Sequence, residues 1–273
     1  MDYLKLYMPS ESLSDDSAAR VQEKPLTNHE RGLKRKISAL RTFYAYYFRH
    51  EMIKTNPTVL IDMPKIHERT IVRLEADEVA ALLDFMESCG EKLTGQSRAY
   101  YEKTKIRDLA IVTLLLGTGI RVSECVGLDI EDVDFRNNGI RVIRKGGNES
   151  IVYFGTEVEK ALTNYIEERK TINPAPGHEH ALFYSMQRKR INVRSVENLV
   201  EKYTSAITSV KKITPHKLRS TYGTSLYRET GDIYLVADVL GHKDVNTTRR
   251  HYAAMDEERR RKAAGAVRLR EED

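Results

Sequence analysis

Three short stretches of this sequence carry side chains that could together break a phosphodiester bond. The first contains Arg121, the second contains His216 and Arg219, and the third contains His242 and Tyr252. A tyrosine hydroxyl can act as the nucleophile, and imidazole and guanidinium groups can stabilise the charge that develops on the phosphate. Each stretch is weak alone, because the chain has 15 tyrosines and a lone tyrosine usually packs with its hydroxyl in water. The order of the three stretches along the chain makes this set of residues suitable for attack on a phosphodiester.

The stretch Thr214–Arg219 predicts the start of a helix that could hold an anion. Thr214 can be the N-cap, and Pro215 can take the first helical position, where its missing N–H has no consequence. His216 and Arg219 are three residues apart and would share a face near the positive end of the helix. With the free backbone N–H groups they would form a site that suits phosphate. The alternative is a capped surface helix with ordinary charges.

Two further cations lie in predicted turns. Arg121 follows the turn Gly117–Gly119, which could let the backbone approach a ligand while the guanidinium holds more phosphate oxygens. Otherwise Arg121 forms a surface salt bridge, with Glu124 as the partner at i+3. Lys145 lies at the tip of a predicted hairpin, where it is either solvated or able to reach a substrate as a proton donor.

The site must take a proton from the nucleophile and give a proton to the leaving group. A free tyrosine has a pKa of about 10, so roughly one in a thousand is phenolate at neutral pH. Activating Tyr252 is therefore worth about 4 kcal/mol, part of which His216 could supply as a base. The leaving 5′-oxygen is as basic as hydroxide and needs an acid, for which Lys145 is the candidate.

The remaining barrier must be lowered by charge stabilisation. Arg121 and Arg219 would act on the phosphorane, with His242 as a further hydrogen-bond donor. This scheme needs no metal and no cofactor. The cluster His178–His180 lies in a predicted Pro/Gly loop and is not expected to bind a metal.

Composition bounds the class of protein. The chain has 273 residues, of which 31% are charged, and its net charge is +5. Its positive charge is clustered, which suits a nucleic-acid partner. Cys89 and Cys125 have neither a metal-ligand nor a CxxC spacing, and the first ten residues do not form a signal peptide, so a cytoplasmic location is expected. The longest apolar run, Leu109–Leu116, is too short to cross a membrane.

Residues 1–64 predict a small helical domain. We expect a short helix over 1–8, a loop over 9–24, and a helix to about His50 that starts with Thr27 as N-cap and Glu30 three residues later. An apolar stripe follows this helix at Leu33, Ile37, Leu40, Tyr44 and Tyr47. Its other faces carry five cations, Arg31, Lys34, Arg35, Lys36 and Arg41. These cations could lie along a phosphate backbone or could simply form a solvated face.

Residues 65–73 predict an interdomain linker, and residues 74–273 a second domain. The expected elements are a helix over 74–88, a loop over 89–104, an apolar helix over 106–116, a helix from 121, strands over 132–135, 140–144 and 150–154, and helices over 157–170, 192–208, 215–230, 232–239, 246–253 and 256–265. Turns at Asn138-Gly139 and Gly146-Gly147-Asn148 would join the strands. The fold class is therefore mainly α with one small antiparallel sheet.

Together these motifs resemble the tyrosine recombinases, or phage integrase family, and within it the Xer-type recombinases. The segments that carry the resemblance are Gly119–Glu124, Lys145-Gly146, Pro215–Arg219, Leu240–His242 and Tyr252. It covers about residues 74–262, and the basic helix over 28–50 resembles the core-binding domain of the family. That domain normally has another helix before the stretch that Asp2–Leu4 resembles, so the resemblance implies an N-terminal domain that is either truncated or degenerate.

The resemblance implies a mechanism and an assembly. Tyr252 would attack the scissile phosphate to give a 3′-phosphotyrosyl link and a free 5′-hydroxyl, and a partner strand would reverse the step without ATP. The enzyme would act on double-stranded DNA as a tetramer, through a Holliday junction, for chromosome-dimer resolution or for integration and excision of a mobile element. Asp256–Val267 resembles the segment that packs onto a neighbouring subunit. In the family the tyrosine commonly lies at the place of His251, one residue earlier, and one helical step turns a side chain by about 100°.

Two other functions stay open. Separately, one set of cations is expected to contact DNA. A DNA-binding accessory protein would keep the fold without the reaction, and a type IB topoisomerase-like enzyme would relax DNA by the same chemistry. The residues expected to contact DNA are Arg31, Lys34, Arg35, Arg41, Arg188, Lys189, Arg190, Lys217 and Lys243.

Overall fold

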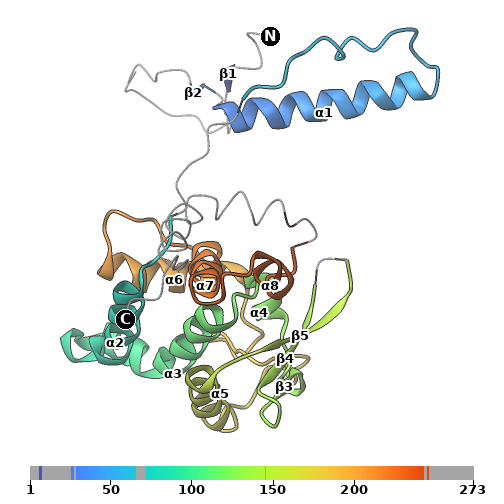
Figure 1. Cartoon of the computed structure of the whole chain (residues 1–273). Helices are drawn as coiled ribbons and strands as arrows, with labels where there is room; N and C mark the ends of the chain where they lie inside the picture. Colours follow the sequence, from blue (N-terminus) through green and yellow to red (C-terminus); the bar gives the residue numbers. More distant parts are fainter. Residues whose placement is uncertain are drawn as a thin grey trace, which may run out of the picture. The chain divides into compact units, whose positions relative to one another are not determined.

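The chain divides into two compact units, Met1–Thr70 and Ile71–Asp273 (Figure 1). The division falls within the segment 65–73. The computed structural model describes residues 6–7, 26–27, 29–65, 72–144, 146–242 and 245. No described helix combines the length and the apolar character that a membrane span requires.

Among its described residues, the first unit contains two short strands and one long helix. Strand β1 (Leu6–Tyr7) pairs antiparallel with β2 (Leu26–Thr27), and helix α1 covers Glu30–Arg49. The predicted helix over 1–8 is therefore wrong at residues 6–7, and Thr27 lies in a strand while His29 is the N-cap. Both errors have one cause: the partner strand lies about 20 residues away, so no local periodicity reveals the pairing.

The apolar stripe of α1 is confirmed. Ile37 is fully buried, and the other four stripe residues are half-buried, whereas the opposite face is exposed. The segment after α1 runs back along the helix (Figure 1). There the backbone N–H and the hydroxyl of Thr58 both donate to Asn56 Oδ1, at 3.0 and 2.7 Å, and Arg41 donates to Ile61 O.

The second unit is mainly helical and carries one small sheet, as the sequence predicts. Its elements are α2 (Ala76–Ser88), η2 (Cys89–Lys92), α3 (Gly95–Thr118), α4 (Val122–Gly127), η3 (Ile130–Asp132), β3 (Val133–Asp134), β4 (Gly139–Ile143), β5 (Glu149–Tyr153), α5 (Thr156–Arg169), α6 (Val193–Ile207), α7 (Pro215–Thr230) and α8 (Ile233–Val239). The strands form an antiparallel sheet in the order β3-β4-β5, with Ile140 opposite Val152. The predicted turn residues Asn138, Gly146 and Gly147 all have positive φ.

The predicted loop over 89–104 is wrong from residue 95 onward, where α3 begins. The segment looks polar because most of its side chains are exposed, but Tyr101 is 2% exposed and Thr104 is fully buried. The Tyr101 hydroxyl is within hydrogen-bonding distance of Met86 O, at 2.9 Å, and of Glu87 O, at 2.7 Å. Two buried positions one turn apart are too few to show a helical period in the sequence.

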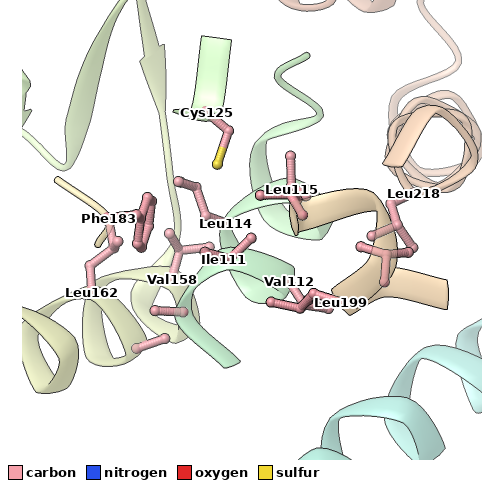
Figure 2. Packing of buried hydrophobic residues seen from close by; sticks show 14 of the residues in the cluster. Ile111, Val112, Leu114, Leu115, Cys125, Val158, Leu162, Phe183, Leu199 and Leu218 are labelled. Carbon is pink, nitrogen blue, oxygen red and sulfur yellow. The ribbon is translucent and has the colours of Figure 1, made fainter. Parts of the chain in front are cut away.

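Helix α3 is the centre of the core (Figure 2). Ile111 and Leu114 face Val158 of α5, while Leu115 lies toward Leu218 of α7. All five side chains are nearly or fully buried. Because α3 is apolar on several sides, it is enclosed by other elements, and this packing fixes its C-terminal end and the turn at residues 119–121 that follows it.

The glycine turn after α3 is used for packing. Gly119 has a φ of 62°, and its backbone approaches the side chains of Tyr222 and Leu240 so closely that a Cβ would lie 2.3 Å and 3.0 Å from them. The room that the sequence suggested for a ligand at this glycine is therefore filled by the protein's own side chains.

Replacement of Gly119 by alanine should lower Tm more than the same replacement at Gly95. Both glycines have a left-handed φ, 62° and 56°, and both variants incur about 1 kcal/mol of strain for that reason. At Gly95 no described atom lies within 4 Å of the new Cβ, whereas at Gly119 the clash with Tyr222 should add about 2–3 kcal/mol. Thermal melts of the two variants check this, and equal losses would contradict it.

An ion pair joins α2 to the segment that leads into α7. Lys211 Nζ lies 2.5 Å and 2.7 Å from the two carboxylate oxygens of Glu78. The hydrogen bond from Lys211, then that from the backbone N–H of Glu75, lowers the pKa of Glu78 below its usual 4.5. The pair therefore stabilises the fold at neutral pH, where the carboxylate is ionised.

Replacement of Glu78 by glutamine should reduce stability by about 1 kcal/mol at pH 7 and by progressively less below pH 4.5. A carboxyl whose pKa is lowered in the folded state contributes its stability above the unfolded pKa and loses it as the pH falls through the folded pKa. Melting curves of both proteins between pH 7 and pH 3 measure the difference. A difference that stays constant over this range would show that the charge of Glu78 has no part in it.

Candidate active site

The turn that ends α8 is the centre of the candidate site. Gly241 has a φ of 59°, its N–H donates to Asp238 O at 2.8 Å, and the N–H of His242 donates to Ala237 O at 2.8 Å. This pair of bonds is a Schellman arrangement, which glycine favours because it adopts the left-handed conformation without steric cost. The arrangement leaves the carbonyl groups of residues 239–241 for other donors.

Three arginines from different elements occupy these carbonyl groups. The carbonyls of residues 239, 240 and 241 accept hydrogen bonds from Arg144, Arg219 and Arg121, respectively. Arg144 follows β4, Arg219 lies on α7, and Arg121 is the N-cap of α4. Cations are favoured at the C-terminal end of a helix, where the carbonyl dipoles point outward. The turn therefore gathers three guanidinium groups beside His242.

The carboxylate of Glu124 holds two of these arginines together. Its side chain is 3% exposed, and its Oε1 accepts from Arg121 Nη1 at 2.6 Å. Its Oε2 accepts from the backbone N–H of Arg121 at 2.8 Å and from Arg144 Nη1 at 3.2 Å. The predicted ion pair between Arg121 and Glu124 is thus confirmed. Arg121 keeps 34% of its side chain exposed, so it can still reach a ligand.

Arg144 is a site residue that no sequence motif marks, although the strand pattern offers a signal for it. Ile140 and Val142 of β4 are buried, and Arg144 follows on the same side of the strand at the next even position. Its side chain is only 10% exposed. A charged residue that continues a buried face indicates a specific partner inside the protein.

Helix α7 positions the two predicted residues Arg219 and His216 differently. Thr214 is the N-cap and Pro215 the first helical residue, as predicted, although the Thr214 side chain makes no capping hydrogen bond with the described backbone. His216 is exposed. Arg219 is 4% exposed, and its Nη1 donates to Gly119 O at 2.6 Å. Arg219 thus ties the end of α3 to the turn after α8, while His216 faces outward.

Several predicted residues lie outside the described part of the chain. These are the candidate acid Lys145, the candidate nucleophile Tyr252, the predicted DNA contact Lys243, and the predicted helices over 246–253 and 256–265. Described residues flank Lys145 on both sides, and His242 is the last residue before Lys243. In the described part, no group of His, Cys, Asp and Glu side chains has the arrangement of a metal site.

The cations assigned to DNA on α1 fall into two groups. Arg31, Lys34 and Arg35 are exposed. Arg41 is half-buried and donates to Ile61 O, so it holds the segment after α1. The three exposed cations are free to contact phosphates electrostatically, whereas Arg41 also holds the segment that follows α1.

The cations of the turn at residues 185–190 also differ in their exposure. Arg188 and Lys189 are exposed, and the turn is closed by Ser185 N–H to Lys189 O at 2.7 Å and Arg188 N–H to Ser185 O at 2.8 Å. Arg190 is half-buried and pairs with Asp129. Lys217, on α7, is half-buried too. Arg188 and Lys189 are therefore the most accessible of these predicted DNA contacts.

Comparison with known proteins defines the class to which this site belongs. Residues 72–259 match the phage integrase family, a range that includes the three arginines, both histidines and Tyr252. The chain belongs to this family and is a tyrosine recombinase, an enzyme of site-specific recombination.

Individual relatives narrow the comparison to the Xer recombinases. Tyrosine recombinase XerC of Pelobacter propionicus is 34% identical over 218 residues, which cover 80% of this chain and 67% of the relative. The crystal structure of XerA recombinase is similar with a TM-score of 0.58 at 28% identity, over 85% of this chain and 75% of XerA. A structure of the XerH site-specific recombinase bound to palindromic difH substrate, a post-cleavage complex, has the same fold, with a TM-score of 0.69 at 21% identity over 86% and 67% of the two chains.

Proposed function

We propose that this enzyme breaks and rejoins DNA strands with Tyr252 as the nucleophile. The Tyr252 oxygen forms a bond to the scissile phosphorus while the bond from phosphorus to the 5′-oxygen breaks. The phenolic proton goes to His216, and Lys145 protonates the 5′-oxygen as it leaves. The 5′-hydroxyl of a partner strand then attacks the 3′-phosphotyrosyl link and releases Tyr252. The phosphotyrosyl ester conserves the free energy of the phosphodiester that was broken, so the rejoining step needs no ATP.

One observation supports this proposal most strongly: the turn Leu240–His242 gathers three guanidinium groups and an imidazole just before the Tyr252 segment. A phosphorane carries an extra negative charge, and cations that are already held in place stabilise it without reorganisation during the reaction. Arg121 is anchored through Glu124 and Gly241 and remains partly exposed. It is therefore suited to hold the non-bridging oxygens together with His242, while the buried Arg219 adds positive charge behind the turn.

The proposed assembly follows from the family and from the charges of the two units. Double-stranded DNA is the partner, since XerH was crystallised on its difH substrate and both units of this chain expose cations. Residues 1–64 would bind the core of the site, residues 65–73 would link the units, and residues 74–273 would carry the chemistry. A tetramer in the cytoplasm would join two sites through a Holliday junction, with Asp256–Val267 packed onto a neighbouring subunit. Its task would be chromosome-dimer resolution or integration and excision of a mobile element.

A plasmid test separates recombination from the related activities. The preferred duplex is first recovered from a random-sequence library by repeated binding selection, and two direct copies are then placed on a supercoiled plasmid. Recombination predicts excision of the intervening DNA as a separate circle, and the Tyr252→Phe variant should give none. Relaxation without excision would indicate a topoisomerase-like enzyme. Binding with no change in the DNA would indicate an accessory protein.

A further inference from the structure

We infer that Arg144 is a positioning residue of the strand-cleavage site, which fixes Arg121 and the turn Gly241–His242 relative to each other. The inference deepens the proposed function and rests on it. Arg144 is 10% exposed, so its guanidinium is not placed to touch the DNA. Its effect on the reaction must pass through the groups that it contacts.

The backbone of Arg144 is held at the base of the hairpin that joins β4 to β5. Its N–H donates to Asn148 O at 2.8 Å, and its carbonyl accepts from Gly147 N–H at 3.0 Å. These two bonds close the turn and fix the direction in which the side chain leaves the strand. The hairpin thus fixes the position from which the Arg144 side chain extends into the site.

The two ends of the Arg144 guanidinium group contact two different parts of the site. Nη2 donates to Val239 O at 2.8 Å, at the end of α8. Nη1 donates to Glu124 Oε2 at 3.2 Å, on α4. A planar group with donors at fixed angles can join two acceptors in this way, whereas an ammonium group acts as a single point. Arg144 therefore joins α4 to the α8 turn with one side chain, in addition to the bond from Arg121 to Gly241 O.

The second contact determines the position of Arg121. Glu124 accepts from Arg121 Nη1 with Oε1 at 2.6 Å. Arg144, together with the backbone N–H of Arg121, occupies Oε2 and keeps the carboxylate from rotating. Without Arg144, the Glu124 carboxylate would lose one of its two cations and Arg121 would lose a fixed anchor. Catalysis is sensitive to such displacements, because a misplacement of about 1 Å can reduce a rate about 100-fold.

The packing against Gly241 determines the position of the turn. A Cβ at Gly241 would lie 3.0 Å from Nε, 3.1 Å from Cζ and 3.3 Å from Cδ of Arg144. The end of the Arg144 side chain thus packs closely against Gly241 and supports the residue that precedes His242. Removal of Arg144 would leave a gap beneath this turn and would leave Val239 O without the donor described here.

The first test compares Arg144→Gln with Arg141→Gln, because Arg141 lies in β4, the strand that Arg144 follows. Arg141 is 51% exposed and pairs with Asp132 on the outer side of the sheet, so it controls for the loss of a cation from β4. Single-turnover cleavage of a nicked duplex and DNA affinity are measured for both. Arg144→Gln should cleave about 10–100-fold more slowly, with affinity within about twofold of the unchanged protein. Arg141→Gln should cleave at the unchanged rate.

Arg144→Lys keeps the charge but can reach only one of the two acceptors. Its cleavage rate should therefore lie between those of Arg144→Gln and the unchanged protein. This variant replaces Arg144→Gln in the test if thermal melts show that Arg144→Gln is unfolded. A rate for Arg144→Lys equal to that of the unchanged protein would show that the two-point contact has no role.

The second test separates Arg144 from the proposed acid Lys145. A duplex whose bridging 5′-oxygen is replaced by sulfur has a thiolate leaving group, which needs no acid because a thiol has a pKa near 8.5 rather than that of an alcohol. This substrate should restore cleavage by Lys145→Ala. It should not restore cleavage by Arg144→Gln, because Arg121 and the turn act on the charge of the phosphorane.

Each outcome decides between the inference and its rivals. A normal rate for Arg144→Gln, recovery of that variant on the sulfur substrate, or an equal loss for Arg141→Gln would overturn the role given to Arg144. If the unchanged protein forms no covalent adduct on either substrate, the proposed strand cleavage fails and the inference fails with it. Cleavage by the unchanged protein separates these two kinds of failure.

Discussion

Tyr252→Phe should abolish DNA strand cleavage while leaving DNA affinity within about twofold of the unchanged protein. The phenylalanine lacks the oxygen that forms the bond to phosphorus, and loss of a nucleophile reduces a rate by a factor on the order of 10⁴ or more. Affinity depends on cations that contact phosphates, which this change does not affect. Single-turnover cleavage of a nicked duplex and a binding titration at the same salt concentration measure both quantities.

His251→Phe is the matched control for Tyr252→Phe. His251 holds the place at which the family commonly has its tyrosine, so this variant tests whether the one-residue displacement matters. It should retain covalent adduct formation. Persistent adduct formation by Tyr252→Phe would mean that another residue is the nucleophile.

Arg219→Lys should lower both the cleavage rate, by about 100-fold or more, and the stability of the second unit. Arg219 is 4% exposed and donates to Gly119 O at 2.6 Å and to Leu240 O. A lysine cannot reach both carbonyl groups, and a buried acceptor left unpaired costs about 1–3 kcal/mol. The same loss would displace the end of α3 from the turn after α8, and with it Arg121 from His242.

Arg228→Lys, on the same helix, is the control for Arg219→Lys. Arg228 pairs with Glu75 at 2.7 Å, and both side chains are more than one-third exposed. Such pairs contribute little, so the melting temperature and the cleavage rate should hardly change. If Arg219→Lys loses stability but cleaves at the normal rate, Arg219 is a structural residue and takes no part in charge stabilisation.

The helices and strands of the second unit could be predicted because their patterns are local. The apolar run before Gly117, the turn at Asn138-Gly139 and Pro215 at a helix start each act over a few residues. The start of α3 could not be predicted, because Tyr101 is buried by residues of α2 that the local sequence does not reveal. Strands β1 and β2 could not be predicted either, because each pairs with a segment that its local sequence does not reveal.

The residue types of the site could be predicted, but their geometry could not. The order of Arg121, Arg219 and His242 along the chain indicates the chemistry, yet their contacts join elements about 100 residues apart in sequence. The carbonyl groups that gather the arginines belong to a backbone turn, which carries no side-chain signal beyond Gly241. Arg144 shows the consequence: its role depends on partners at 124 and 239 that no local pattern identifies.

The covalent bond that we propose between Tyr252 and DNA, at the site that the α8 turn organises, can be trapped and identified directly. A nicked duplex that loses a short fragment on cleavage traps such an intermediate, and mass spectrometry of the digested adduct identifies the linked residue. We predict a single adduct through a 3′-phosphate on Tyr252. An adduct on any other residue, or bound and nicked duplex that yields no adduct at all, would contradict the account.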